Sequence, residues 1–208
     1  MIEIESAQRS LADAFEQCAR ESPDARLVVA SPTRAADLPL STVHERGERF
    51  AAHLARLGIG AGDIVALQLP AWSEWMIACV GIARAGAIML PVVSIYGAKE
   101  LGFILRESGA KMIVTPDVWR KFDYNAILAE CGDLPALQHH VVIGDTVPSH
   151  AVRWDDMLAP VDAAPIVPRA PDDIAMLVYT SGTTADPKGV QHSHRSLLSE
   201  METVAAAR

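Results

Sequence analysis

The sequence lacks any paired-cysteine pattern. Its three cysteines, Cys18, Cys79 and Cys131, are widely spaced, and none belongs to a CxxC motif. An odd number of cysteines without a framework argues against a disulfide scaffold and is typical of a reducing cytoplasm. The first ten residues, MIEIESAQRS, also lack the apolar core of a secretory signal. These absences predict a cytoplasmic protein.

Long apolar runs are also absent. The most hydrophobic stretch, residues 64–96, is interrupted by Pro70, Glu74, Arg84 and Pro91. No part of it approaches the ~20 apolar residues that a membrane-spanning helix needs. We therefore expect this stretch to be buried inside a globular protein, and we expect no transmembrane segment.

An excess of positive charge is missing as well. The chain has 18 Lys and Arg against 26 Asp and Glu, a net charge of −8, and no basic run. This balance argues against nucleic acid and anionic membrane surfaces as partners. Half of the 208 residues are hydrophobic and 21% are charged, which is enough apolar surface for a core in one large or two small domains.

Helix-like and strand-like segments alternate along most of the chain. Helices are predicted at residues 10–21, 42–57, 73–85, 99–108, 118–130 and 194–207. Strands are predicted at residues 27–30, 38–40, 64–69, 87–92, 111–115, 140–143 and 173–179. Thr42 and Glu45 have the spacing of a capping box at the start of the second helix, and Gly58 is expected to end that helix.

The strands between residues 60 and 143 are nearly continuous in apolar residues and are separated by helices. This pattern predicts βαβ units, and therefore an α/β fold with a parallel sheet that is covered on both faces. Residues 144–173 carry several prolines and acidic residues around one small island at residues 153–158. We expect them to be a connector.

The strongest functional signal is LVYTSGTTADPKGV, residues 177–190. An apolar strand-like run ends in hydroxyls and glycine, followed by Pro-Lys-Gly. A loop with small side chains lets backbone N–H groups approach an anion, hydroxyls add donors, and a lysine adds positive charge. The predicted phosphate-binding residues are Thr180, Ser181, Gly182, Thr183, Thr184 and Lys188. The alternative is a plain Thr/Gly-rich surface turn.

The loop differs from the nucleotide P-loop GxxxxGK[ST] at three points. Counted from Gly182, Lys188 comes one residue late, Pro187 stands where the second glycine should be, and Gly189 replaces the Ser/Thr. Two nearby histidines, His192 and His194, have no cysteine or acidic residue at metal-ligand spacing, so we expect no metal site on them.

The segment YTSGTTADPKGV instead resembles the phosphate-binding signature of the adenylate-forming superfamily, close to YTSGTTGxPKGV. This superfamily includes acyl-CoA synthetases, luciferases and the adenylation domains of peptide synthetases. Ala185 stands where the family usually has glycine. If that position needs a positive φ, alanine costs about 1 kcal/mol and weakens nucleotide binding.

Three further segments resemble the family, so the resemblance covers essentially the whole chain. They are GIGAGDIVALQLPAWSEWMIACVGIARAGAIMLPV, KELGFILRESGAKMIV and VQHSHRSL. Ala71 and Ser196 depart from the family's common residues at their positions.

The resemblance implies ATP-dependent activation of a carboxylic acid, fatty or alicyclic, to an acyl-adenylate and then to an acyl-CoA. The substrates would be ATP, a small carboxylate and coenzyme A, with Mg²⁺ as counter-ion. The phosphate-binding residues named above would hold the β- and γ-phosphates. Apart from the resemblance, His194 is expected to pack beside the phosphate loop, either in a structural role or in contact with the ligand. An adenylation domain that loads a carrier protein is an alternative within the family.

The resemblance also implies that the chain is an N-terminal fragment. Residues 1–170 would form the N-terminal α/β subdomain of the AMP-binding domain, and residues 171–208 would begin the next subdomain, with the phosphate loop at 180–190. The catalytic residues would follow Arg208 and are unknown. We therefore expect the chain alone to be inactive and to self-associate through surfaces exposed by truncation. A non-catalytic fragment or split subunit that acts by interaction stays an alternative.

Overall fold

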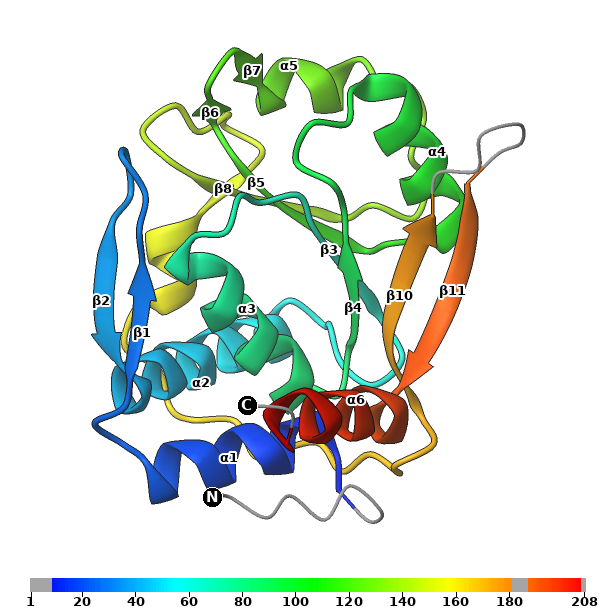
Figure 1. Ribbon diagram of the computed structural model, residues 1–208. Helices are drawn as coiled ribbons and strands as arrows, with labels where there is room; N and C mark the ends of the chain where they lie inside the picture. The colour runs from blue at the N-terminus through cyan, green and yellow to red at the C-terminus, as the bar shows by residue number, and fades with distance from the viewer. Residues whose placement is uncertain (1–8, 181–186, 207–208) are drawn as a thin grey trace.

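A seven-stranded sheet organises the chain. The computed structural model describes residues 9–180 and 187–206, and Figure 1 shows the sheet with helices packed around it. From edge to edge the strands are β11 (Lys188–Ser193), β10 (Ile174–Thr180), β4 (Ile88–Pro91), β3 (Ile64–Leu67), β5 (Met112–Pro116), β8 (His139–Ile143) and β9 (Val152–Arg153). All neighbours are parallel except β10 and β11, which are antiparallel. The predicted α/β fold with a parallel sheet is confirmed.

Side chains of the central strands alternate between two apolar layers. Val65 and Leu67 of β3 belong to the core that the sheet shares with the second and third helices, whereas Ala66 belongs to the core on the fourth helix. These helices are α2 (Leu40–Arg56), α3 (Ser73–Arg84) and α4 (Ala98–Ser108). Because successive side chains of a strand point to opposite faces, a sheet covered on both faces needs continuous apolar strands.

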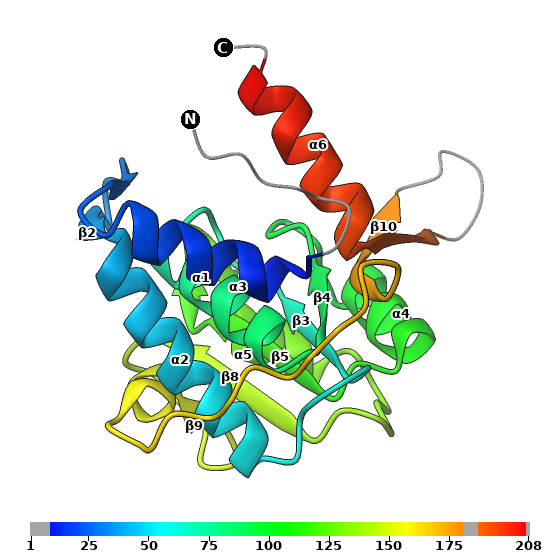
Figure 2. The same ribbon diagram turned by 90° about the horizontal axis from the view of Figure 1, so that it is seen from below.

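Helix α1 (Leu11–Glu21) begins as the sequence predicts. The Ser10 hydroxyl accepts a hydrogen bond from the Asp13 backbone N–H (3.3 Å), and the Asp13 carboxylate accepts one from the Ser10 N–H (2.9 Å). This capping box satisfies donors that the first turn would leave unpaired. Figure 2 shows α1, α2 and α3 gathered on one face, with a gold connector running past them toward β10.

The second helix begins earlier than its sequence predicts. Thr42 and Glu45 have capping-box spacing, but α2 starts at Leu40, its N-cap is Pro39, and no side chain caps it. The preceding strands are β1 (Arg26–Val29) and β2 (Ala36–Pro39), which pair as an antiparallel hairpin. The Leu40 N–H donates to the Ala25 carbonyl (2.8 Å), so strand pairing fixes the helix start in place of the capping box.

Residues 118–130 do not form the single helix that was predicted. They form the hairpin of β6 (Val118–Trp119) and β7 (Phe122–Asp123), followed by the short helix α5 (Tyr124–Ala129). Arg120 at the turn has a φ of 55°, a left-handed conformation that a right-handed helix cannot contain. Asp123 then starts α5 by accepting a hydrogen bond from the Ala126 N–H (3.0 Å).

Residues 144–173 form the predicted connector. It contains β9 and a 3₁₀ helix, η2 (Trp154–Leu158), at the small island seen in the sequence. The Val167 N–H donates to the Arg84 carbonyl (2.9 Å), which ties the connector to the end of α3. Helix α6 (His194–Ala206) follows β11. Within residues 9–180 and 187–206, no helix is both long and apolar enough to cross a membrane.

Candidate functional site

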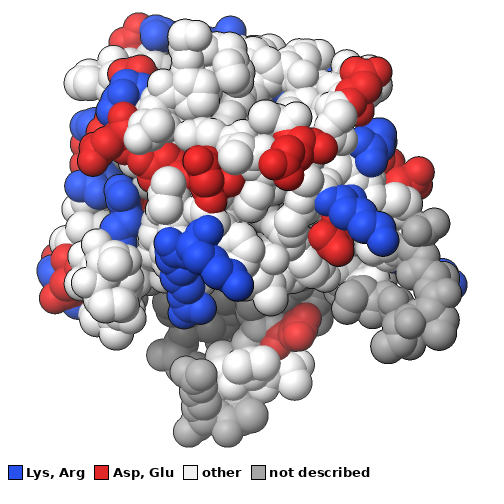
Figure 3. Space-filling model, turned by 90° about the horizontal axis from the view of Figure 1, so that it is seen from above, with Lys and Arg blue, Asp and Glu red and all other residues white. Residues whose placement is uncertain are grey.

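The carboxyl ends of five strands lie at one edge of the sheet. Strands β10, β4, β3, β5 and β8 run parallel, so the loops that follow them gather at this edge. Parallel α/β sheets bind ligands at such an edge. Figure 3 views the molecule from above, where acidic and basic side chains are interspersed around one compact basic group. The candidate phosphate loop follows β10 at this edge.

Thr180 and Lys188 lie opposite each other at the loop end of the β10–β11 hairpin. They are register partners, and the Thr180 hydroxyl donates a hydrogen bond to the Lys188 carbonyl oxygen (3.5 Å). Both residues are exposed. The hairpin therefore brings a hydroxyl-bearing residue and an ammonium-bearing residue together where the loop leaves the sheet.

The other predicted phosphate-binding residues fall outside the part of the chain that the structure describes. They are Ser181, Gly182, Thr183 and Thr184, and Ala185 is outside it too. Their roles, and the effect of alanine at 185, stay predictions. The sequence did not predict β11, in which Lys188 is the first residue.

The hairpin is anchored on the side of α4. Leu177 and Tyr179 pack against the core cluster that contains the buried α4 residue Leu101. Gly189 lies directly over them: a Cβ at this glycine would come within 3.1 Å of the Leu177 Cδ1 and 3.3 Å of the Tyr179 ring. Burial raises the pKa of Tyr179, and the negative charge of Glu107 raises it further. The strand ends are thus fixed while Thr180 and Lys188 remain accessible.

His194 lies at the other end of the hairpin from the loop. It is buried, and its Nδ1 accepts a hydrogen bond from the Leu11 N–H (3.1 Å) at the start of α1. His194 comes six positions after Lys188 along the chain, and extended chain of that length spans about 20 Å. Burial lowers the pKa of His194, and the charge of Arg169 adds to this effect. These contacts give His194 a structural role in joining β11 to α1.

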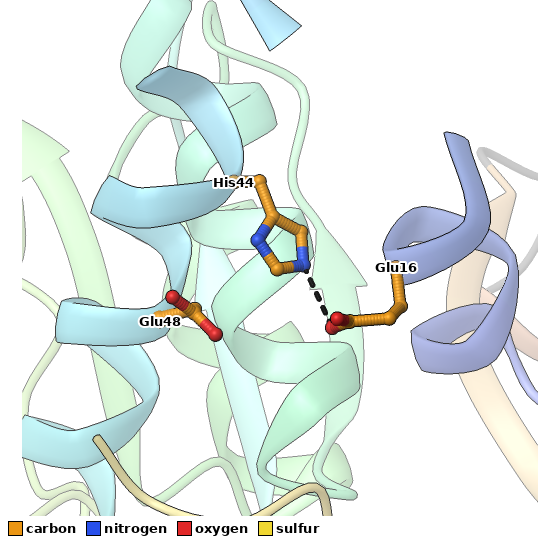
Figure 4. Close-up of side chains that lie close together, drawn as sticks. All are labelled: Glu16, His44 and Glu48. Carbon is orange, nitrogen blue, oxygen red and sulfur yellow. Dashed lines mark ion pairs between the residues drawn. The ribbon is translucent and has the colours of Figure 1, made fainter. Parts of the chain in front are cut away.

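A second cluster of titratable groups joins α1, α2 and α3. In this cluster, ligand-type atoms of Glu16, His44 and Glu48 lie within 4.8 Å of one another. Figure 4 shows Glu16 on α1 and His44 on α2 facing each other. The His44 Nε2 lies 3.1 Å from the Glu16 carboxylate. Arg84 already pairs with Glu16 (3.0 Å) and with Glu48 (2.9 Å). A guanidinium between the two carboxylates offsets part of their charge and opposes a metal cation there. The cluster therefore ties three helices together.

The sequence did not reveal this cluster, because its members come from three helices that meet only in the fold. His44 and Glu48 are four residues apart on α2, a spacing that places both on one helix face. That spacing is the one signal that could have indicated it.

The fold and the hairpin define an α/β protein with a candidate anion site at the carboxyl edge of a parallel sheet. Residues 15–208 match the model of the family described as "AMP-binding enzyme". The chain belongs to this adenylate-forming family, which confirms the resemblance.

Relatives agree with this assignment. A salicyl-AMP ligase / salicyl-S-ArCP synthetase of Mycobacterium tuberculosis is 36% identical, over 89% of this chain and 33% of that protein. A long-chain-fatty-acid–CoA ligase of Escherichia coli is 31% identical, over 95% and 39% respectively. The solved structure of acetoacetyl-CoA synthetase from Streptomyces lividans shares the fold with a TM-score of 0.84 at 24% identity, covering 93% of this chain and 31% of that one. The chain spans between 33% and 39% of the length of these two curated relatives.

Proposed function

We propose that this chain is the N-terminal part of an enzyme that activates a carboxylic acid with ATP. In the reaction a carboxylate oxygen attacks the α-phosphorus and pyrophosphate leaves. The thiol of coenzyme A then attacks the acyl carbon of the acyl-adenylate, and AMP leaves. Family membership supports the first step. The observation that carries the proposal is the hairpin that brings Thr180 and Lys188 together at the carboxyl edge of the sheet.

The role of the hairpin is to hold the phosphates that leave. Negative charge builds on the β- and γ-phosphates as the bond to the α-phosphorus breaks, and fixed positive groups lower the barrier. The Lys188 ammonium would pair with these oxygens. The Thr180 hydroxyl and the loop residues Ser181, Gly182, Thr183 and Thr184 would donate hydrogen bonds to them. Mg²⁺, which prefers oxygen ligands, would be held mainly by the phosphates and would offset their charge.

The acid is proposed to be fatty or alicyclic. Segments such as LPAWSEW and SIYGAKELGFILRESGAK look more like those of fatty- and alicyclic-acyl-CoA ligases than those of peptide synthetases. The Escherichia coli relative is named for long-chain fatty acids. The name of the Mycobacterium tuberculosis relative, salicyl-S-ArCP synthetase, favours one alternative, transfer of the acyl group to a carrier protein in place of coenzyme A.

The chain by itself is proposed to be inactive, because it spans about a third of the length of such relatives. The catalytic residues of the proposed enzyme would follow Arg208, so turnover would require the full-length protein. A non-catalytic product that acts by interaction is the remaining alternative. Turnover by the full-length protein would contradict that alternative.

Nucleotide binding tests the site. Removing a charge-assisted hydrogen bond costs about 1.5–3 kcal/mol, or roughly 10- to 100-fold in Kd. Lys188→Ala in the full-length protein should therefore weaken Mg·ATP binding by about this factor, measured by calorimetry. Lys99→Ala removes the same charge from an exposed position on α4 and should leave the affinity unchanged. Equal Mg·ATP affinities for the two variants would show that Lys188 does not bind the nucleotide.

A further inference from the structure

A polar hollow lies apart from the hairpin, between α2, the start of α3 and η2. Its volume is about 360 Å³, and its walls include three arginines, Arg34, Arg46 and Arg49. Figure 1 shows the start of α3 on the side of the β1–β2 hairpin, next to the yellow segment that carries η2. This segment follows β9, at the sheet edge opposite β11, and no lining residue belongs to the β10–β11 hairpin.

Arg34 is held in place at one wall. Its guanidinium donates to the Glu74 carboxylate (2.7 and 2.8 Å) and lies over the Trp72 ring, 5.0 Å from the centroid. The second oxygen of Glu74 accepts a hydrogen bond from the Ser73 hydroxyl (3.0 Å). Both oxygens of this buried carboxylate are therefore engaged, and Glu74 orients Arg34 at the wall.

The other two arginines are differently placed. Arg49 pairs with Glu45, which does not line the hollow, and donates a hydrogen bond to the Leu158 carbonyl (3.4 Å). Arg46 is half-buried and has no hydrogen-bond or ion-pair partner among residues 9–180 and 187–206. The remaining acidic residue of the lining, Asp155, is exposed. The lining therefore carries three guanidiniums and two carboxylates, and once the pairs with Glu74 and Glu45 are counted, the Arg46 guanidinium is left without a carboxylate partner within the described chain.

The start of α3 belongs to the same wall. Ser73 and Glu74 are the first two residues of this 12-residue helix, and the N-cap residue Trp72 makes no side-chain cap. The first N–H groups of a helix have no partner within it, and the helix dipole places partial positive charge there. Uncapped N–H groups beside several guanidiniums are the donor set that phosphate oxygens accept from.

We propose that this hollow binds a phosphate-type dianion, such as orthophosphate, pyrophosphate or a phosphate monoester. Oxygens of the anion accept hydrogen bonds from Arg46 and Arg49 and from the N–H groups at the start of α3, with Arg34 closing one side. A dianion with three or four oxygens matches several guanidinium forks better than a carboxylate with one charge and two oxygens. The proposal does not depend on the function proposed for the hairpin.

Inorganic phosphate is the probe, and the ¹⁵N-labelled 208-residue chain is the sample, at constant ionic strength because salt screens these charges. Phosphate should shift the backbone signals of Ser73 and Glu74 and the Nε–Hε signal of Arg46 along one saturating curve. Arg46→Gln should weaken binding at least tenfold. Arg56→Gln removes the same charge from the exposed end of the same helix and should bind as the wild type does. Lys188→Ala should also leave this binding unchanged, which separates this site from the hairpin.

A second variant at Arg46 distinguishes a loss of phosphate binding from a folding defect. Arg46→Lys keeps the charge but loses the two-pronged fork, so its affinity should fall between those of the wild type and Arg46→Gln. The proposal is overturned if the phosphate shifts rise linearly without saturation. It is also overturned if the Arg46 variants, folded as judged by their spectra, bind as Arg56→Gln does.

Discussion

At the scale of single residues, the two buried histidines show how burial sets their protonation. His140 lies on β8, and its Nε2 is 2.8 Å from the Thr115 hydroxyl of the neighbouring strand β5. Burial lowers its pKa from 6.5 to about 4, and the charge of His150 adds to this effect. Burial also lowers the pKa of His194, which caps the start of α1. Both imidazoles favour the neutral form, so acid should destabilise the fold.

This predicts a loss of stability between pH 7 and pH 5. Below pH 6.5 the unfolded chain takes up a proton on His140, whereas the folded chain does not until about pH 4. The unfolded state therefore binds more protons in this window, and stability falls as the pH falls. The contribution at pH 5 is about 2 kcal/mol, at 1.36 kcal/mol per unit.

Urea unfolding at pH 7 and at pH 5 measures this effect. His140→Gln should reduce the difference in unfolding free energy between the two pH values, although it lowers stability at pH 7. His192→Gln removes a half-buried imidazole on β11 and should keep the full difference. A pH dependence that is the same in both variants would contradict the account of His140.

At the scale of elements, close approach of α2 and α3 explains two of the glycines. A Cβ at Gly47 would lie 2.4 Å from the Val80 Cγ1, and one at Gly81 would lie 2.8 Å from the Gly47 carbonyl oxygen. Real Cβ contacts are longer, so a side chain at either glycine forces the helices apart. Overpacking of this kind costs about 1–3 kcal/mol.

Gly47→Ala should therefore lower the free energy of unfolding by about 2 kcal/mol, the middle of the range for overpacking. Gly97→Ala is the matched control, because a Cβ there meets its nearest neighbour at 3.9 Å and the glycine has a φ of −88°. The two proteins are compared by urea unfolding at pH 7. Equal stabilities would show that the helices can separate without cost.

The central sheet could be predicted from the sequence, because strands that are apolar throughout must be buried on both faces. The predictions failed where contacts with neighbouring segments determine the local structure. The segment KGVQHS (β11) is strand only because β10 pairs with it, and α2 starts early because β2 leads into it. Residues 118–130 break at Arg120, whose positive φ leaves no sign in the sequence.

The candidate site was predictable only in part. The motif identified Thr180 and Lys188, but their pairing across a hairpin needs the register of two strands. Arg46 and Arg49 are three residues apart on one helix face, which the sequence shows, whereas Arg34 and the start of α3 join them only in the fold.

At the scale of the whole molecule, α6 and the edge strand β11 expose three large apolar residues. Met201 and Val204 are 49% and 52% exposed, and Val190 on the edge strand is 42% exposed. Unpaired strand edges and exposed apolar faces favour association. The division of the chain into subdomains at residues 1–170 and 171–208 stays a proposal. Strand β10, from the second of these ranges, pairs with β4 from the first and so belongs to the same sheet.

We predict that the 208-residue chain self-associates as its concentration rises, which sedimentation velocity would measure. Replacing both Met201 and Val204 by lysine should shift the chain toward monomer. Val28→Lys, at an exposed position on β1, should not. A wild-type chain that stays monomeric at all concentrations would refute this prediction.

Carboxylate-dependent exchange of labelled pyrophosphate into ATP tests the central claim most directly. The full-length protein should catalyse this exchange only when a suitable acid is added, Lys188→Ala should reduce it at least tenfold, and Lys99→Ala should retain it. The 208-residue chain alone should show none. Failure of the full-length protein to exchange with any fatty, alicyclic or aromatic acid, or full exchange by Lys188→Ala, would contradict the account.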